Sequence, residues 1–256
     1  MKSSNGLLQG RVFENSAIEL HGNLALEETI LRHMEKPTIM FWKNQSSVIV
    51  GRGQIVDEEV NLNFCLKNRI TLGRRMTGGG TVFHDLGNLN TSIFLPRTLL
   101  TITDVCQSSY LLTELFAESI KRVGFPQIEC NGSYDVLYKG LKISGAAAYF
   151  SKNFILHHST LLVDVDLTNL EGSIIHHPEE KKRRNSNYRP TTNLKDLNVV
   201  EWKQTLIELL GRKFNIDFHL EDVKSEEKSY ARSLRNKVYT RNEWIFEGVR
   251  PNKLAL

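Results

Sequence analysis

RRMTGGGTVFHDLGN, residues 74–88, is the densest chemical signal in this 256-residue chain. Its three consecutive glycines (78–80) cannot favour the interior of a helix or strand, because each loses much backbone freedom on ordering. Without Cβ atoms, however, the backbone can lie directly against a ligand and point its N–H groups at anionic oxygens. The adjacent Arg74 and Arg75 supply charge-assisted donors for the same anion. The stretch therefore predicts an anion-binding site, and its spacing matches neither a P-loop nor a dinucleotide fingerprint.

The composition is that of an ordinary soluble globular protein, 40% hydrophobic and 24% charged. No run approaches the roughly 18 apolar residues of a membrane-spanning helix, and the N-terminus lacks the order of a secretory signal. We therefore expect a cytoplasmic protein with no membrane partner. The net charge of +4 favours phosphate-bearing ligands or an acidic protein partner and is too weak to imply nucleic acid. Cys65, Cys106 and Cys130 are too widely spaced to indicate a disulfide framework or a thiolate zinc site.

Residues 134–148 form a second chemical segment. Lys139-Gly140 predicts a hairpin turn, because glycine permits the positive φ that tight hairpins require. Lys142 lies between apolar neighbours and is followed by Gly145 and three alanines, so its ammonium is expected to project into a site lined by small residues. A positive charge there stabilises a carboxylate or phosphoryl oxygen during acyl transfer. The alternative is a lysine on the exposed face of a hairpin, a role that suits Lys139.

His157 and His158 enter a predicted strand. Adjacent strand residues point to opposite faces, so the two histidines cannot easily share one metal ion, and no metal ligand is assigned. We expect one of them to be packed in the interior and the other to line the site.

Apolar periodicity interleaves helices and strands along the whole chain. Helices are expected at residues 23–34, 103–123, 168–175, 200–214 and 225–237, and strands at 38–42, 47–50, 88–95, 134–138, 141–144 and 160–165. Asn23 is expected to cap the first helix, and the first two strands to form a hairpin. A basic and polar loop is expected at 176–189. The pattern predicts an α/β or α+β fold, with a mixed β-sheet flanked by helices.

In this order, the segments resemble the lipoate-protein ligase A family within the biotin and lipoate ligase fold. The resemblance covers roughly residues 20–200 and implies a biotin/lipoate ligase-type catalytic domain. The matching segments are residues 51–54 (G-R-x-Q), 74–88 (R-R-x-[ST]-G-G-G-x-V-[FY]-H-D-x-G-N), 135–145 (D-x-x-x-x-G-x-K-[IV]-[SA]-G), 157–162 (H-H-x-T-L-L) and 189–194 (R-x-x-[TV]-N-L).

The resemblance assigns roles to individual residues. The residues that it places around an acyl-adenylate are Arg75, Thr77, Gly78, Gly79, Gly80, Val82, His84, Asp135, Gly145, Ala147 and His158. Val82 and His84 would lie beside the acyl chain, and Asp135 would hold the nucleotide side. Lys142 would be the central catalytic cation, in contact with the activated carboxyl and phosphate oxygens.

The resemblance also implies a reaction. A fatty carboxylate attacks the α-phosphate of ATP, with Mg²⁺, to give an acyl-adenylate and pyrophosphate, and an acceptor lysine then attacks the mixed anhydride. Lipoate would be the substrate, and the acceptor would be a lipoyl-domain protein of the glycine cleavage H protein or 2-oxoacid dehydrogenase E2 type. Both steps move negative charge between oxygens, which fixed donors and a lysine stabilise without an enzyme nucleophile.

One departure from the family pattern concerns the C-terminus. Family ligases usually continue into an accessory domain that supports adenylation, whereas this chain ends shortly after Glu243-Trp244. We therefore expect residues 1–256 to form a single catalytic domain without the accessory domain. Either a separate small accessory subunit completes the enzyme, or the chain performs only the transfer half-reaction from a ready-made acyl-adenylate or acyl-protein.

Three alternatives remain open. An ATP-independent octanoyl or lipoyl amidotransferase of the same fold would use a cysteine nucleophile, and Cys130 lies five residues before Asp135. The surroundings of Cys130, however, do not resemble the Cys-Phe context of those transferases. A biotin ligase would carry a different glycine-rich signature. A non-catalytic binder of lipoylated proteins is the third alternative, and the intact Arg75 and Lys142 argue against it.

A run of four basic residues at 181–184 is expected to lie in a solvated loop. If acceptor domains are acidic, this run would steer their docking, and the effect would fade with salt.

Overall fold

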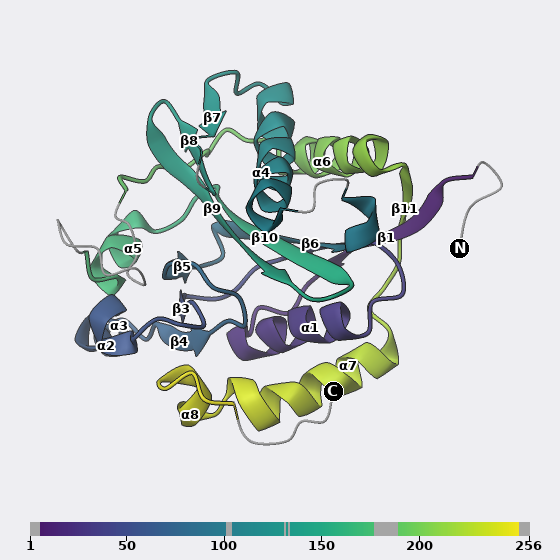
Figure 1. The fold of residues 1–256 in the computed structure, drawn as a ribbon. Helices are drawn as coiled ribbons and strands as arrows, with labels where there is room; N and C mark the ends of the chain where they lie inside the picture. The colour runs from purple at the N-terminus through teal and green to yellow at the C-terminus, as the bar shows by residue number, and fades with distance from the viewer. Residues whose placement is uncertain (1–5, 101–103, 131, 133, 177–188, 251–256) are drawn as a thin grey trace.

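The structure, a computed structural model, describes residues 6–100, 104–130, 132, 134–176 and 189–250. A mixed sheet of eight strands runs through its centre (Figure 1). In spatial order the strands are β11 (Ile216–Leu220), β1 (Leu8–Asn15), β2 (Thr38–Trp42), β6 (Asn88–Pro96), β10 (Phe154–Leu162), β9 (Leu141–Phe150), β8 (Asp135–Tyr138) and β7 (Ile128–Cys130). β11, β1 and β2 are parallel neighbours and the other pairs are antiparallel, so the predicted mixed sheet is confirmed.

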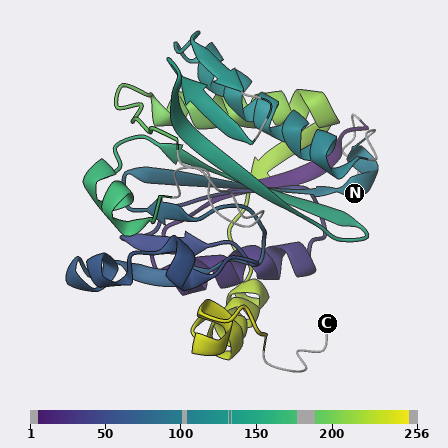
Figure 2. The same ribbon diagram turned by 60° about the vertical axis from the view of Figure 1, so that its left-hand side comes forward.

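Helices cover both faces of this sheet (Figures 1 and 2). α4 (Val105–Arg122) and α6 (Val199–Phe214) lie on one face. α1 (Leu20–Arg32) lies on the other face, and α7 (Ser225–Leu234) packs against the outer side of α1. No described helix combines the length and the apolar character needed to cross a bilayer.

Apolar side chains fill the layers between sheet and helices. Phe116 of α4 and Trp202 of α6 are fully buried and meet edge to face, with ring centroids 5.4 Å apart. On the opposite face, Leu20, Leu24 and Ile30 of α1 are buried in a second cluster. Removing this much apolar surface from water is the main stabilising contribution to such a layered fold.

A second, three-stranded sheet lies beside the first one. Its order is β4 (Thr71–Arg74), β3 (Ser47–Val50) and β5 (Val82–His84). The remaining elements are α2 (Val56–Glu59), α3 (Leu62–Lys67), η1 (Arg97–Leu99), α5 (Leu167–Ser173), the π-helical turn η2 (Arg235–Tyr239) and α8 (Asn242–Ile245). α2, α3 and α5 contribute apolar side chains to the cluster on which the small sheet packs.

The expected hairpin between residues 38–42 and 47–50 is wrong. β2 pairs with β1 and β6 in the large sheet, whereas β3 pairs with β4 and β5 in the small one. Both strands are buried along their whole length, so each needs neighbours on two sides. The segment between them therefore carries the chain from one sheet to the other.

The expected N-cap of the first helix is also wrong. Glu19 caps α1, and its Oε2 accepts from the backbone N–H of Gly22 at 2.7 Å. Asn23 lies one turn further along, where its side chain instead bonds the backbone of the loop before α1 and the loop after β2. Asn is a preferred N-cap residue whereas Glu is not, so residue type alone pointed to Asn23, four positions too late.

Arg74 does not point at a ligand, contrary to the expectation from the Arg-Arg pair. It is 1% exposed, and its guanidinium donates to five backbone carbonyls. Those carbonyls belong to Gly51, Arg52, Gln54, Ile245 and Phe246, at 2.8–3.1 Å. Arg74 therefore joins the C-terminal end of α8 to the loop that supports the glycine triplet.

Candidate active site

Two cavities lie between the glycine loop and strands β9 and β10. The glycine loop, residues 75–81, joins β4 to β5. The larger cavity has a volume of about 240 Å³, and the smaller one about 80 Å³. The residues that line both are Thr81, Val82, Lys142, Gly145 and Thr160. The two cavities therefore adjoin, and Lys142 stands where they meet.

A β-bulge places Lys142 at this junction. Asp135 pairs with Gly145 across the β8–β9 hairpin, but Leu137 pairs with Lys142 after a register shift next to Val136. Strand side chains alternate between faces, so residues three apart would normally point in opposite directions. The extra residue puts Lys142 on the same face as Asp135 and Gly145.

Asp135 holds the Lys142 ammonium in place. Lys142 Nζ lies 2.7 Å from Asp135 Oδ1, and Arg189 Nε lies 3.1 Å from Asp135 Oδ2. The side chains of Lys142 and Asp135 are 24% and 17% exposed, so the pair is partly shielded from solvent. A Cβ on Gly145 would come within 3.1 Å of Lys142 Nζ, so any side chain there would press against the ammonium.

Arg75 binds the glycine loop itself. Its NH2 group donates to Gly78 O at 2.6 Å and Gly80 O at 2.7 Å, and its Nε donates to Thr77 Oγ1 at 3.0 Å. Burial lowers the pKa of Arg75 to about 10, an effect that the charge of Glu27 opposes, so the guanidinium stays charged at neutral pH. A fixed buried cation thus shapes the loop and gives the cavity a positive wall.

Gly51 supports the loop from behind. A Cβ at this position would lie 2.1 Å from Gly79 O, which no side chain could occupy without moving the loop. Gly79 itself has a φ of +85°, a conformation that favours glycine. The loop after β3 is thus packed backbone to backbone against the triplet, and Arg52 N donates to Thr77 O at 2.8 Å.

A buried polar chain runs behind the larger cavity from the loop to α1. Thr77 Oγ1 lies 2.9 Å from His158 Nε2, and His158 Nδ1 lies 2.8 Å from Glu27 Oε1. The same Glu27 oxygen accepts from Ser92 Oγ at 2.6 Å. Glu27 is 1% exposed and was not singled out from the sequence, where it reads as one of two adjacent helical glutamates.

His84 lines the larger cavity and lies against Trp42. The two rings meet edge to face, with centroids 5.8 Å apart. Burial, with smaller effects from the charges of Arg75 and His158, lowers the pKa of His84 to about 3. His84 is therefore a neutral hydrogen-bonding group at physiological pH.

The adjacent histidines face opposite sides of β10, as expected. His158 lines the larger cavity, whereas His157 is fully buried and its Nε2 lies 3.1 Å from Thr113 Oγ1 of α4. Burial, followed by the charge of His158, lowers the pKa of His157 to about 3 from the ordinary 6.5. His157 is therefore a packed core residue and His158 a site residue.

The buried His157 predicts a pH-dependent contribution to stability. Between the ordinary pKa of 6.5 and the folded-state pKa of about 3, His157 is protonated in the unfolded chain but neutral in the folded one. The free energy of unfolding therefore decreases as the pH falls through this range. Between pH 7 and pH 5, the free energy of unfolding should fall by roughly 2 kcal/mol more in the parent chain than in His157→Gln. Urea unfolding at both pH values measures this, and equal losses in the two proteins would contradict it.

The structure brings together most of the residues singled out from the sequence. Those in the lining of the larger cavity are Arg75, Gly79, Gly80, Val82, His84, Asp135, Lys142, Gly145, Ala147 and His158. Thr77 and Gly78 lie outside both linings and bond Arg75 and His158 from behind. Further lining residues that the sequence analysis did not single out are Leu24, Trp42, Ile49, Asn90 and Tyr134. Most of these are apolar or uncharged and carried no motif of their own.

Cys130 lies away from both cavities. It lines an open groove between α4 and β7, together with Glu114 and Lys121. Burial and the charge of Glu114 raise the pKa of its thiol, so the thiolate that a nucleophile requires is disfavoured. Among the described residues, no cysteine lines either of the two cavities.

The basic run at residues 181–184 and most of the expected loop at 176–189 lie outside the described residues. At the edge of that loop, Arg189 and His176 line the smaller cavity, and His176 Nε2 lies 2.9 Å from Glu171 Oε2.

Known proteins with similar sequences match most of this chain. Lipoate-protein ligase A subunit 1 of Thermoplasma acidophilum is 32% identical over 93% of this chain and 96% of its own length. The probable lipoate-protein ligase A of Mycoplasma pneumoniae is 33% identical over 81% of this chain, which spans only 62% of that longer relative.

Solved structures of lipoate-protein ligases have a similar fold over most of the chain. A bipartite lipoate protein ligase from Thermoplasma acidophilum, studied with its E2 lipoyl domain, superposes with a TM-score of 0.81 at 30% identity, covering 96% of this chain and 99% of the other. A lipoate-protein ligase A bound with ATP superposes with a TM-score of 0.80 at 29% identity, covering 94% and 100%. The family model described as the lipoyl protein ligase A/B catalytic domain matches residues 19–211. The chain therefore belongs to the lipoyl protein ligase A/B catalytic domain family.

Proposed function

We propose that the chain activates lipoate with ATP to lipoyl-AMP and transfers the lipoyl group to a specific lysine of a lipoyl-domain protein. The observation that carries this proposal is the position of Lys142, which lines both adjoining cavities. A ligand with two arms, an acyl chain and a nucleotide, would occupy one cavity with each arm. Its mixed anhydride would then lie beside the Lys142 ammonium.

The linings suit this division. The larger cavity presents the apolar side chains of Leu24, Trp42, Ile49 and Val82, as an acyl chain requires. In the first step a lipoate carboxylate oxygen attacks the α-phosphate and pyrophosphate leaves. In the second step the acceptor amine attacks the carbonyl carbon and AMP leaves. The Lys142 ammonium stabilises the negative charge that develops on the oxygens in both steps.

Mg²⁺ would enter with ATP. Within the described ranges, no three His, Cys, Asp or Glu side chains gather as a metal cage. Mg²⁺ usually keeps several waters and binds through substrate phosphates with one or two carboxylates. Asp135 can supply one such carboxylate at the junction, where it forms ion pairs with Lys142 and Arg189. The residues therefore fit an ion brought in by the nucleotide, whose charge would offset that of the phosphates.

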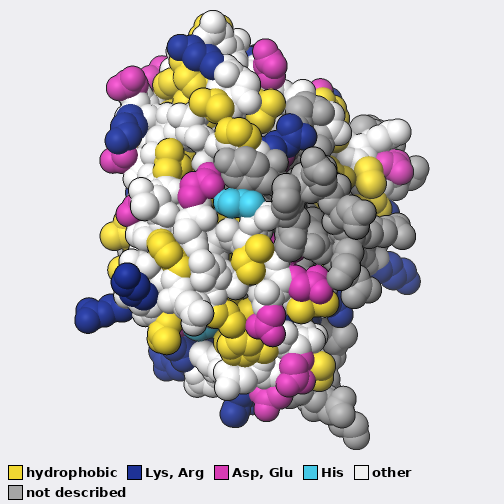
Figure 3. All heavy atoms as spheres, turned by 90° about the vertical axis from the view of Figure 1, so that its left-hand side faces the viewer, with side chains coloured by type: hydrophobic (Ala, Val, Ile, Leu, Met, Phe, Trp, Pro, Cys, Tyr) yellow, Lys and Arg dark blue, Asp and Glu magenta, His cyan; other side chains and the backbone are white. Residues whose placement is uncertain are grey.

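The partners are proposed by analogy with the bipartite Thermoplasma ligase and its E2 lipoyl domain. We propose that this chain acts as a single catalytic domain, that a separate accessory subunit supports adenylation, and that the acceptor is an E2-type lipoyl domain or the glycine cleavage H protein. The reaction would take place in the cytoplasm. On the face shown in Figure 3, acidic and basic side chains are interspersed among hydrophobic ones, so charge alone marks no docking area on that described surface.

Lipoate-dependent exchange between ATP and labelled pyrophosphate tests the first step. We expect exchange when the accessory subunit is present, and transfer to an acceptor lipoyl domain from synthetic lipoyl-AMP by this chain alone. Exchange by the isolated chain would remove the need for an accessory subunit. Absence of transfer from synthetic lipoyl-AMP to every acceptor domain tried would overturn the proposed function and favour a non-catalytic binder.

A further inference from the structure

The larger cavity is lined by a buried histidine with one ring nitrogen that is unpaired among the described residues. His84 is 4% exposed and lines this cavity, and within the described part of the chain its Nε2 makes no hydrogen bond. Its other ring nitrogen, Nδ1, lies 3.1 Å from Asn44 Nδ2. An unpaired polar atom in such a place costs free energy unless a ligand supplies the missing partner.

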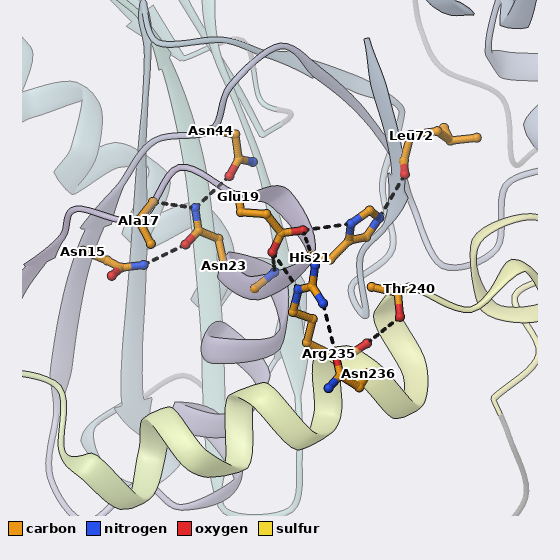
Figure 4. A network of polar contacts seen from close by, with 11 residues as sticks. Asn15, Ala17, Glu19, His21, Asn23, Asn44, Leu72, Arg235, Asn236 and Thr240 are labelled. Atoms are coloured by element: carbon orange, nitrogen blue, oxygen red, sulfur yellow. Dashed lines mark hydrogen bonds and ion pairs between the residues drawn. The ribbon is translucent and has the colours of Figure 1, made fainter. Parts of the chain in front are cut away.

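Asn23, Asn44 and His84 are linked in series by hydrogen bonds, and backbone carbonyls next to Asn23 determine which atoms in the series are donors. Asn23 Nδ2 lies 3.0 Å from Ala17 O and 2.9 Å from Lys43 O, and both are acceptors only, so this atom must be the amide nitrogen. The same nitrogen lies 2.8 Å from Asn44 Oδ1, so its two hydrogens are shared among three acceptors, and the Asn44 atom that faces it must be the oxygen. Figure 4 shows Asn23 between Asn15, Ala17 and Asn44. The amide nitrogen of Asn44 therefore faces His84.

The tautomer of His84 follows from this direction. Asn44 Nδ2 donates, so His84 Nδ1 accepts and the single proton of the neutral ring lies on Nε2. Burial holds the pKa of His84 near 3, which keeps the ring neutral. The cavity thus contains an N–H donor whose direction is set by backbone carbonyls of two loops.

The position of this donor indicates which part of a ligand it meets. Lys142 lines both cavities, whereas His84 lines only the larger one and touches Trp42. Val82 lines both cavities, and His84 lies two positions further along β5 on the same face of the strand. An acyl chain whose carboxylate lies at the junction therefore extends along β5 toward His84. Two further groups among the described residues, Asn90 Nδ2 and Ser159 Oγ, are also buried without a hydrogen-bond partner and belong to residues that line the same cavity.

We infer that His84 Nε2–H donates to a sulfur of the dithiolane ring and so selects lipoate over a plain alkyl acid. Sulfur is a weak, polarisable acceptor, and octanoate offers no acceptor at that end of its chain. Binding octanoate would leave the donor buried and unpaired. The inference rests on the proposed function, because it places lipoate in the larger cavity.

Calorimetric titration of the chain without ATP separates the hydrogen bond from shape. The three ligands are lipoate, octanoate and 5-cyclopentylpentanoate, which keeps a five-membered ring but replaces both sulfurs by carbon. The parent chain should bind lipoate roughly fivefold to tenfold more tightly than the cyclopentyl acid, the ratio that one net hydrogen bond contributes. In His84→Phe and His84→Leu, which lack the donor, the ratio should fall to about one.

The matched control is His33→Phe, because His33 lies outside both cavities and stacks on Tyr230 at 4.5 Å. This variant should keep the parental ratio, and far-UV circular dichroism checks that each variant is folded. Equal affinity of the parent chain for lipoate and the cyclopentyl acid would overturn the inference. So would a parental ratio in both folded His84 variants. Binding of none of the three acids to the parent chain would instead contradict the proposed function.

Discussion

Replacing Lys142 by methionine is expected to lower the rate of lipoyl transfer from lipoyl-AMP by a factor of roughly 10²–10³, the loss typical when a fixed charge at a reacting oxygen is removed. Methionine keeps much of the side-chain length and removes the ammonium that lies 2.7 Å from Asp135 Oδ1. Single-turnover transfer with excess enzyme measures the chemical step directly. Adenylation should fall in parallel, because both steps develop charge at the same junction.

Lys139→Met is the matched control for this prediction. Lys139 lies three residues away on the same hairpin, where its Nζ sits 5.0 Å from the centroid of the Tyr138 ring and outside both cavities. Its removal should leave the transfer rate within about twofold of the parent, since it affects only an exposed cation–π contact. A Lys142→Met enzyme with near-parental transfer would show that another group stabilises the reacting oxygens.

Replacing Gly51 by alanine is expected to reduce kcat/KM for transfer about a hundredfold. The added methyl group would stand 2.1 Å from Gly79 O, so the glycine loop must move before the side chain fits. A displacement of about 1 Å in a positioned group has a cost of this order. Transfer kinetics with varied lipoyl-AMP measure it, and the KM should rise because the wall of the larger cavity is displaced.

Gly53→Ala provides the control two residues away. A Cβ there meets no atom within 4 Å, and its φ lies outside the positive range, so the loop has no reason to shift. Its kinetics should match those of the parent. Parental kinetics in Gly51→Ala would show that the glycine loop adapts without loss, and would contradict the close-packing account.

The sequence was sufficient for much of the site because the ligand-facing groups are clustered in short motifs. The glycine triplet, Arg75 and His84 lie within ten positions of the chain, and Lys142 follows in a second motif. The residue types alone indicate the chemistry: the glycines leave the backbone open to a ligand, Arg75 has a guanidinium with several donors, and Lys142 has an ammonium group. The mixed sheet with flanking helices was likewise predictable from periodicity.

Other features depend on contacts between distant segments, and no local pattern reveals them. Arg74 has the same residue type as Arg75, but its carbonyl partners include Ile245, 171 positions away. The turn-like segment after β2 suggested a hairpin, yet it crosses between sheets because both flanking strands are buried. The edge strand β11 pairs with β1, about 200 positions earlier in the chain, and neither strand was predicted.

Asn44 and Glu27 show the same limitation within the site. Each acts through another side chain, Asn44 through His84 and Glu27 through His158. Neither residue type, taken alone in the sequence, distinguishes such a supporting role from an ordinary loop or helix position. The tertiary structure is needed to see that they determine which atoms face the cavity.

The irregularity at Val136 and Leu137 also restricts how this region can be redesigned. Straightening the hairpin by deleting one residue from β9 would turn the Lys142 side chain toward the core side, where Ile143 is fully buried. We therefore expect that shortening β9 next to this register shift abolishes activity even when every functional residue type is retained.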